Sequence, residues 1–469
     1  MMNLSSELPM ELQGKRRIVR PAGPPDGGYG WFIVLSTFLV FGLTFGVIKS
    51  FGVFFVEIQY YFATTATASS WITSISVATV HFGAPVGSAL SAYFGHRPVV
   101  MAGGLLSSIG MVAGSYAQDL LQLYITVGFL TGFGYALTWT PTVTMLGWYF
   151  EKRRPVANAL ASAGECILTF VLTPSFQFMV DQYSWRGAML ILGALQLNLS
   201  LCGALLRPLN RHVPSKELVE KDDHELELLS RTHTDFSSKN SSDSKKSDPL
   251  KVKIISYMDY TLIVNARFMV YSMFGVFAAL GFFAPALFLV PYARSQGVEE
   301  YQAAALMSIS AVLDLLGRLL FGWVANLRLV KTVHQLTVTV ILLGIVLLLC
   351  PLATTFTQLA LFSAGYGLVF GATVAIHITV LAEVVGVERL GSALGFFMLI
   401  RSSGGLLGPP LAGIFIDKMS DYGAGFLMAG VALLVSALFL LLLHQMNKKG
   451  MEKEKDINLD NGKGCEDLI

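Results

Sequence analysis

The chain has 469 residues, of which 54% are hydrophobic and only 14% are charged, and its mean hydropathy is +0.60. This composition excludes an ordinary soluble domain and indicates a protein that crosses a membrane many times. The net charge is only +2, and no stripe of Lys and Arg alternates with aromatic residues, so a nucleic-acid partner is not expected. No G-x-S-x-G, H-E-x-x-H or Walker sequence is present, and we therefore expect no enzyme activity, no metal and no cofactor.

Hydropathy predicts an all-α membrane protein with twelve transmembrane helices. Each apolar stretch has the length of about 20 residues that a bilayer requires. The expected spans cover residues 31–55, 70–92, 99–116, 121–147, 156–179, 187–206, 259–290, 301–325, 333–352, 356–384, 391–415 and 424–444. Proline inside several spans is compatible with this prediction, because neighbouring helices can satisfy the backbone groups that it frees.

Polar segments divide the chain into units. Residues 208–257 are charged and Ser-rich, cannot bury a core, and predict a flexible cytosolic linker. This linker separates a six-helix bundle over 31–207 from a second bundle over 258–445. Residues 1–30 and 446–469 are expected to be cytosolic tails.

Positive side chains gather on one side of this topology. On that side lie Lys15, Arg16, Arg17, Arg20, Arg97, Lys152, Arg153, Arg154, Arg328, Lys331, Arg389, Lys448 and Lys449. The opposite side keeps only Arg186, Arg294 and Lys418. By the positive-inside rule, both termini are expected to be cytoplasmic.

Segments of the two halves resemble each other. Arg154-Pro-Val-Ala-Asn-Ala-Leu, followed later by Asp181, parallels Arg389-Leu-Gly-Ser-Ala-Leu, followed later by Asp417. Two parallel six-helix repeats around a site near the middle of the membrane are the arrangement of the major facilitator transporters. The sequence therefore predicts the major facilitator fold.

Two charges interrupt the apolar stretch from Ala311 to Arg328. Asp314 and Arg318 lie four residues apart, which places them on one face of a helix. A charge at mid-depth costs about 2.5 kcal/mol or more, so the pair must face a partner or a watery cavity. Asp314 and Arg318 are therefore candidate functional residues. The alternative is a buried ion pair that only fixes helix packing.

Two motifs carry a resemblance to a known family. Asp26-Gly-Gly-Tyr-Gly-Trp31, which leads into the first span, resembles the signature of the monocarboxylate transporter family, solute carrier family 16. Tyr149-Phe-Glu-Lys-Arg-Arg-Pro-Val-Ala-Asn-Ala-Leu-Ala-Ser-Ala-Gly164 is similar to the family's second signature, and the resemblance covers residues 20–210 and 260–445. It implies passive or proton-linked movement of small organic monoanions through a central cavity that opens alternately to each side.

The resemblance also implies roles for individual residues. Lys49, Asp314 and Arg318 match the lysine and the Asp/Arg pair that bind proton and carboxylate in the proton-coupled members. Phe370 matches a substrate-lining phenylalanine, but Val374 replaces the family's serine one turn later, which argues against a lactate-type pocket. For Lys49, the alternative interpretation is a side chain that reaches the outer headgroups.

The chemistry of the pair can be understood without the family. A planar guanidinium such as that of Arg318 binds a carboxylate in bidentate fashion. If Asp314 binds a proton, it stops neutralising Arg318, which can then pair with a substrate anion. One proton and one anion would thus move in an electroneutral step.

Glu165 and Arg401 are further charges near mid-depth of their spans. Glu165 is interpreted as a second partner of Arg318 or a second proton site, and Ser-Ala-Gly-Glu-Cys resembles the branch of the family associated with ketone bodies. Arg401 is interpreted as a ligand of the substrate carboxylate or a neighbour of His81. Purely structural pairing is the alternative for both. His81 and His377 each stand alone in an apolar span, and we interpret them as hydrogen-bonded packing residues and not as proton carriers.

We therefore expect a plasma-membrane carrier of small monocarboxylates, such as ketone bodies or acids like lactate and pyruvate, with proton symport. The alternative within the carrier class is proton-independent movement of creatine, an amino acid or a related solute. A channel would not explain two six-helix repeats. A receptor that senses a metabolite without moving it is a further alternative, and only a measurement of flux would separate it from a carrier. The expected partners are the substrate, the proton, the bilayer and, as for several members of the family, a single-span accessory glycoprotein.

Overall fold

The computed structural model describes residues 26–150, 153–207, 261–326, 330–386 and 389–466. Every regular element in these ranges is helical, which confirms the predicted all-α class. The predicted linker 208–257 and most of the predicted N-terminal tail 1–30 lie outside the described residues.

The first half of the chain forms helices up to residue 205. They are α1 (Gly30–Phe41), the π-helical turn η1 (Gly42–Gly46), α2 (Val47–Ser50), α3 (Gly52–Tyr61), α4 (Ala66–Phe94), α5 (His96–Ser115), α6 (Leu120–Leu123), the π-helical segment η2 (Tyr124–Leu130), α7 (Thr131–Tyr149), α8 (Arg154–Gln196) and α9 (Asn198–Leu205).

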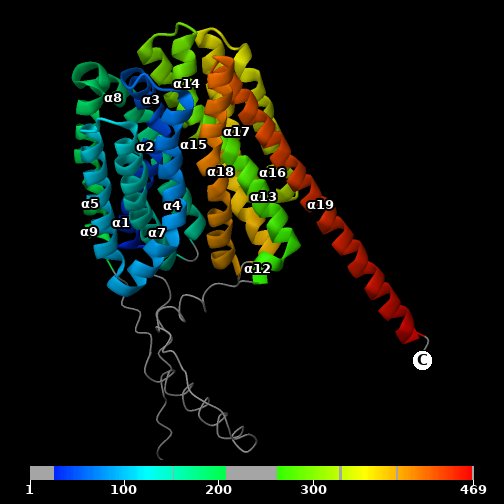
Figure 1. The fold of residues 1–469 in the computed structure, drawn as a ribbon. Coiled ribbons are helices and arrows are strands. Elements are labelled where there is room, and N and C mark those ends of the chain that lie inside the picture. The colour runs from blue at the N-terminus through cyan, green and yellow to red at the C-terminus, as the bar shows by residue number, and fades with distance from the viewer. Residues whose placement is uncertain (1–25, 151–152, 208–260, 327–329, 387–388, 467–469) are drawn as a thin grey trace, which may run out of the picture.

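The second half begins at residue 261. Its helices are α12 (Thr261–Val264), α13 (Ala266–Phe282), α14 (Ala284–Ser295), α15 (Glu300–Asn326), α16 (Thr332–Leu349), the short 3₁₀ turn η3 (Cys350–Leu352), α17 (Phe356–Val385), α18 (Leu390–Met419) and α19 (Gly423–Glu466). Helix α19 continues into the segment predicted as the C-terminal tail, and Figure 1 shows its end projecting away from the bundle.

Eleven helical segments of the described chain are long and apolar enough to cross a membrane. One of them, Val156–Leu205, has 50 residues and is too long for a single crossing of about 20 residues. Its helix is broken at Ser184, where φ is 60° and ψ is 169°, between the predicted spans 156–179 and 187–206. This segment therefore holds two of the predicted spans, and the twelve-span prediction agrees with the structure.

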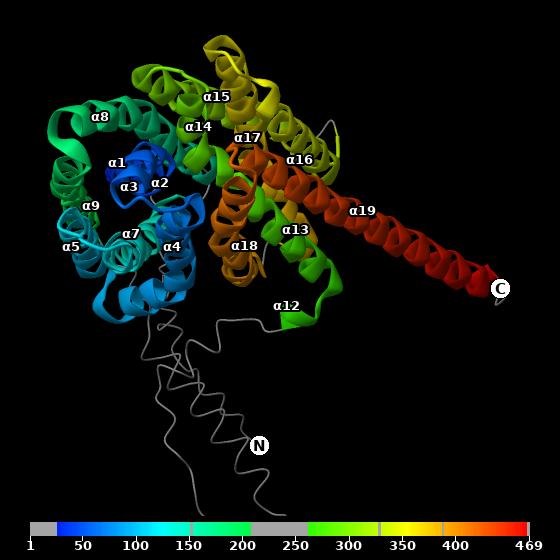
Figure 2. The same ribbon diagram turned by 45° about the horizontal axis from the view of Figure 1, so that its top comes forward.

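Helices of the two halves meet along two main seams. Helix α15 packs on α8, and α18 packs on α4, so each seam joins one helix from either half. In Figures 1 and 2 the helices before residue 208 and those after residue 260 form two groups side by side. The space between the groups is where a site shared by both halves can lie.

Glycines let the helices that carry the charged residues approach closely. A Cβ atom on Gly371 of α17 would lie 2.1 Å from the carbonyl oxygen of Asp314 on α15. A Cβ on Gly164 of α8 would lie 2.0 Å from the carbonyl oxygen of Phe38 on α1. Small residues at such contacts allow van der Waals packing between backbones in a membrane. The backbone positions of Asp314 and Glu165 are therefore fixed by close helix contacts.

The turn before Lys49 departs from an ordinary helix. Residues Gly42–Gly46 form a π-helical turn between α1 and α2, so the first span is not a uniform α-helix. A π turn inserts an extra residue and changes the face on which the following side chains lie, and such turns are frequent at functional sites. Lys49 follows this turn on α2.

Candidate functional site

A cavity of about 2090 Å³ lies between the two halves. It is lined by α1, η1, α2, α4, α7 and α8 on one side and by α13 to α19, apart from η3, on the other. From the charged residues at mid-depth it extends to an end lined by Val156, Val330, Lys331 and Lys448, which we call the open end.

Polar contacts between the halves close the opposite end, which we call the closed end. Arg294 Nη1 on α14 donates to Glu57 Oε1 on α3 at 3.0 Å, and Arg294 also pairs with Glu300. Asp417 on α18 accepts the backbone N–H of Ala66 at the start of α4 at 2.8 Å. None of Glu57, Arg294 and Asp417 lines the cavity. Within the described residues, the cavity is therefore open at one end and closed at the other.

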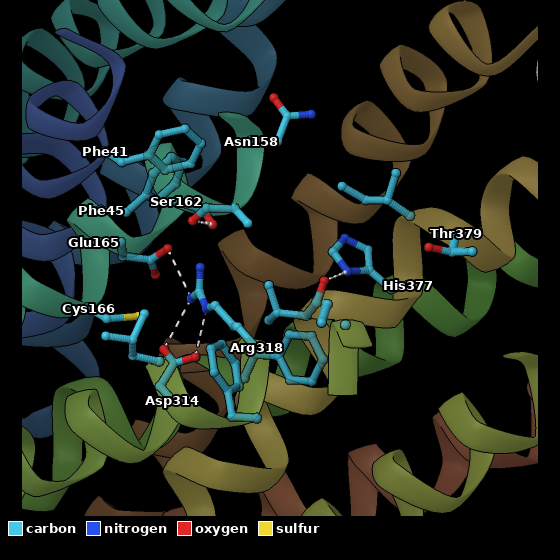
Figure 3. A pocket seen from close by; sticks show the side chains of 18 of the residues that line it. Phe41, Phe45, Asn158, Ser162, Glu165, Cys166, Asp314, Arg318, His377 and Thr379 are labelled. Carbon is cyan, nitrogen blue, oxygen red and sulfur yellow. Dashed lines mark hydrogen bonds and ion pairs between the residues drawn. The ribbon is translucent and has the colours of Figure 1, made fainter. Parts of the chain in front are cut away.

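Four charged side chains meet at mid-depth, and we call them the charge cluster: Lys49, Glu165, Asp314 and Arg318. Figure 3 shows the ion pairs of Arg318 with Glu165 and Asp314. Lys49 Nζ lies 2.7 Å from Glu165 Oε1 and 2.8 Å from Asp314 Oδ2. Arg318 Nε donates to Asp314 Oδ1 at 2.8 Å, and its Nη2 donates to Asp314 Oδ2 and Glu165 Oε2, both at 3.1 Å. Each carboxylate thus bridges the same two cations.

The charge cluster joins the two halves. Lys49 and Glu165 come from α2 and α8, whereas Asp314 and Arg318 both come from α15. Two positive and two negative groups cancel, which is the condition under which buried charges are tolerated. The side chain of Asp314 is only 3% exposed, whereas that of Lys49 is 19% exposed. Lys49 therefore pairs across the cavity instead of reaching headgroups, and Glu165 is a partner of Arg318.

Aromatic rings cover one side of the charge cluster. Lys49 Nζ lies 4.6 Å from the centre of the Phe370 ring, a cation–π distance. The Phe370 ring meets Phe282 edge to face at 5.4 Å and stacks on Tyr366 at 5.5 Å. The Tyr366 hydroxyl donates to the carbonyl of Phe282 at 3.0 Å, which links α17 to α13.

Arg401 lines the same cavity apart from the charge cluster. Its guanidinium lies 5.5 Å from the centre of the Phe282 ring, and Nη1 lies 4.0 Å from Met398 Sδ. Among the described residues, no carboxylate lies within ion-pair distance of Arg401. The structure thus brings five of the six predicted site residues, Phe370 included, to one place and leaves Arg401 as a separate cation.

His81 and His377 also line the cavity. His81 Nδ1 is 2.7 Å from the carbonyl oxygen of Val77, and His377 Nδ1 is 2.7 Å from that of Val374. Both are hydrogen-bonded within their own helices, as expected from the sequence. The His377 ring also lies 6.4 Å from the ring of Phe397, one helical turn before Arg401 on α18.

Sequence reasoning does not single out several lining residues. Phe41, Phe45 and Trp139 form an aromatic wall in which both Phe–Trp pairs are edge to face, with centroids 6.1 and 5.6 Å apart. Phe282 is also unpredicted, because an aromatic residue in an apolar span gives no signal that separates cavity from lipid. Within the described residues, no group of three or more His, Cys, Asp or Glu side chains could hold a metal ion.

Comparison with known proteins identifies the superfamily and the family of the chain. The profile of the Major Facilitator Superfamily matches residues 34–333 and 275–460. Monocarboxylate transporter 2 of Homo sapiens is 38% identical over 434 residues, which cover 92% of this chain and 89% of the relative. The chain belongs to the monocarboxylate transporter family. Monocarboxylate transporter 13 of Bos taurus (38% identical, 90% of this chain and 91% of the relative) and monocarboxylate transporter 7 of Homo sapiens (36%, 89% and 87%) are similarly related.

Solved structures agree with the family fold. A bacterial homologue of the human lysosomal transporter Spinster, crystallised in an inward-facing and occupied conformation, superposes with a TM-score of 0.65. The two chains are 17% identical, and the match covers 89% of this chain and 98% of the other. As a member of the monocarboxylate transporter family with this fold, the protein is a multi-pass membrane transporter and not an enzyme.

Proposed function

We propose that this family member moves small monocarboxylates across the plasma membrane by alternating access, together with a proton. The observation that carries the proposal is the charge cluster in a cavity that reaches one end of the bundle only. The names of the relatives, which are monocarboxylate transporters, support the substrate class.

The coupling follows from the charges. The charge cluster is neutral, and Arg401 adds one positive charge to the cavity. A bound substrate carboxylate adds one negative charge to the cavity. A proton on a carboxylate of the charge cluster adds one positive charge, so substrate and proton together leave the net charge unchanged. Glu165 is the better proton acceptor, because its side chain is 12% exposed and makes one contact with Arg318, whereas Asp314 is 3% exposed and makes two. The freed donors of Arg318 are then available to the cavity.

The orientation is part of the proposal. Lys331, Lys448 and Arg267 line the open end, and positive charges favour the cytosolic side of a membrane. The open end would thus face the cytosol, with both termini on that side. Transport then requires the contacts of Arg294 and Asp417 at the closed end to break while the open end closes. Delivery to the plasma membrane by a single-span accessory glycoprotein belongs to the same proposal, and co-expression tests it.

Uptake into cells tests the proposal. Labelled 3-hydroxybutyrate, lactate and creatine are offered at pH 6 and pH 8 to cells with the wild type, Glu165→Gln or Arg318→Ala, at matched surface levels. Acid-stimulated uptake of an acid that both variants abolish is expected. Asp119→Asn, which changes an exposed side chain outside the cavity, should keep it. If uptake of the acids is equal at both pH values, proton coupling is excluded and only the carrier function remains. If none of the acids is taken up, the whole proposal is overturned.

The aromatic wall favours a second candidate. Phe41, Phe45 and Trp139 are aromatic residues of the kind whose ring faces bind cations. Creatine carries a guanidinium group as well as a carboxylate, so a facilitative creatine carrier would use this wall and leave the charge cluster as a structural element. Uptake of creatine alone, indifferent to pH, would establish this alternative.

A further inference from the structure

The cavity has two separate polar centres. In the charge cluster, each carboxylate of Glu165 and Asp314 is already bound by two cations. In the described part of the chain, the closest contacts of the Arg401 guanidinium are the Phe282 ring at 5.5 Å and the Met398 thioether at 4.0 Å, and no carboxylate pairs with it. The Phe370 ring contacts Lys49, the Phe282 ring contacts Arg401, and the two rings meet edge to face with their centres 5.4 Å apart. Arg401 therefore offers donors to an incoming anion without first breaking an ion pair, whereas Nε and Nη2 of Arg318 already donate to the two carboxylates.

The imidazole of His377 lines the same cavity and lies 6.4 Å from the ring of Phe397, which is one helical turn before Arg401 on α18. The carbonyl oxygen of Val374 can only accept a hydrogen bond, so the Nδ1 atom of His377 carries the proton of the neutral ring. The lone pair is then on Nε2. This atom is buried and has no hydrogen-bond partner among the residues that the structure describes. A buried polar atom without a partner is costly, which is the condition that a ligand can relieve.

Neighbouring residues hold His377 in position. The Tyr271 hydroxyl on α13 donates to the carbonyl of His377 on α17. Tyr271 stacks on Phe397 of α18 at 5.2 Å, and Phe397 lies 6.4 Å from the imidazole ring. Contacts from α13 and α18 thus hold the backbone and one side of the ring of His377, and the Nδ1 hydrogen bond to Val374 sets the orientation of the ring.

We propose that Arg401 and His377 form a subsite for a hydroxycarboxylate. The carboxylate accepts N–H donors of Arg401, and the hydroxyl group of the same substrate donates to Nε2 of His377. A keto acid has no proton to donate, and an unsubstituted acid leaves Nε2 without a partner. A cationic group in place of the hydroxyl would be repelled by Arg401. This inference rests on the proposed function and adds a preference within the monocarboxylates.

A matched set of acids of the same chain length tests the preference. Butyrate, acetoacetate and 3-hydroxybutyrate compete against labelled 3-hydroxybutyrate for uptake by the full-length protein. The wild type should bind the hydroxy acid about three to ten times more tightly than the other two, the range expected for one neutral hydrogen bond. His377→Phe should reduce this ratio to about one. Arg401→Gln should weaken all three acids about tenfold or more, because a charged hydrogen bond is lost.

Controls separate the subsite from folding. His377→Gln keeps an acceptor near the position of Nε2 and should restore part of the ratio. His444→Phe changes a histidine that lines the cavity at its open end and should leave the ratio unchanged. Surface level and a single gel-filtration peak check that each variant folds. If His377→Phe does not fold, the Gln variant together with Arg401→Gln decides.

The outcomes distinguish the two proposals. Uptake of the acids without a preference for the hydroxyl group, or with a preference that His377→Phe retains, overturns the subsite and leaves the carrier function intact. Unchanged acid affinity in Arg401→Gln overturns it as well. If a protein at the cell surface takes up none of the three acids, the proposed function fails, and the subsite fails with it.

Discussion

Removing the ammonium group of Lys49 should damage the charge cluster in a way that a second, specific substitution repairs. Lys49→Met leaves Glu165 and Asp314 with Arg318 as their only cation, so the cluster carries one net negative charge. Lys49→Met combined with Glu165→Gln is neutral again. Lys49→Met combined with Asp314→Asn is neutral too, but it also removes the carboxylate that holds Arg318 through two hydrogen bonds at 2.8 and 3.1 Å.

The magnitude follows from burial. Removing one partner of a buried ion pair costs about 3–5 kcal/mol, because a charge is left uncompensated. The Lys49 side chain is 19% exposed, so we expect the lower end, about 3 kcal/mol. Glu165→Gln should return about 2 kcal/mol of this loss, because the amide can still accept a hydrogen bond and carries no charge. The double variant with Asp314→Asn should return little, because Arg318 then loses its bidentate partner.

Thermal melting of the purified carrier in detergent measures these differences. The wild type should melt highest, followed by Lys49→Met/Glu165→Gln, with Lys49→Met and Lys49→Met/Asp314→Asn several degrees below. Glu165→Gln alone supplies the fourth corner of a double-mutant cycle, so the coupling between Lys49 and Glu165 is obtained directly. The reasoning is refuted if the losses of Lys49→Met and Glu165→Gln simply add in the double variant.

Three further predictions concern the gate, the packing and the aromatic cover. Asp417→Asn should weaken the capping of α4 by about 1 kcal/mol, and the closed end should therefore open more often. A cysteine introduced at Ala286, in the cavity, should then be modified about fivefold faster by a reagent added at the closed end. An unchanged rate would show that Asp417 does not hold this end closed. Gly371→Ala should lower uptake because its Cβ meets the α15 backbone at 2.1 Å, whereas Gly365→Ala in the same helix, with open space, should not. Phe370→Leu removes the ring 4.6 Å from the cluster ammonium and should raise KM about three- to tenfold, and equal KM values would rule this contact out.

The charged site can be predicted from the sequence because of a physical rule with few exceptions. A charge within an apolar span must have a partner or water, so the sequence alone marks Glu165, Asp314 and Arg318 as candidates. The pairing of Glu165 with Arg318 is one of two interpretations that the sequence allows, and the structure shows it at 3.1 Å. Lys49 requires the family resemblance, because a lysine near the end of a span can equally reach headgroups.

Other features depend on tertiary structure and leave no signal in the sequence. The sequence shows Asp417 only as a charge near a helix end, and its partner Ala66 lies 351 positions away in the chain. Hydropathy predicts the break at Ser184 only as a loop between two spans, and it does not predict the π turn at Gly42–Gly46. It averages over windows that are longer than these local departures, so it gives the number of spans and not their internal geometry.

The position of the charge cluster bears on how such a carrier could change state without substrate. A bundle that opens at the closed end has to lose the contacts of Arg294 and Asp417, which join the halves by exposed or partly exposed polar groups. At mid-depth the halves are joined by Lys49 to Asp314 and by Glu165 to Arg318, and these groups leave no net charge in the apolar part of the membrane. An empty carrier could therefore pivot about the charge cluster without exposing an unpaired charge to lipid. A single proton on Glu165 would weaken its contact with Arg318 and leave the contact between Lys49 and Asp314 in place. Proton binding would thus change how the two halves are held together at mid-depth. Acid should therefore shift the conformation of the carrier even in the absence of substrate.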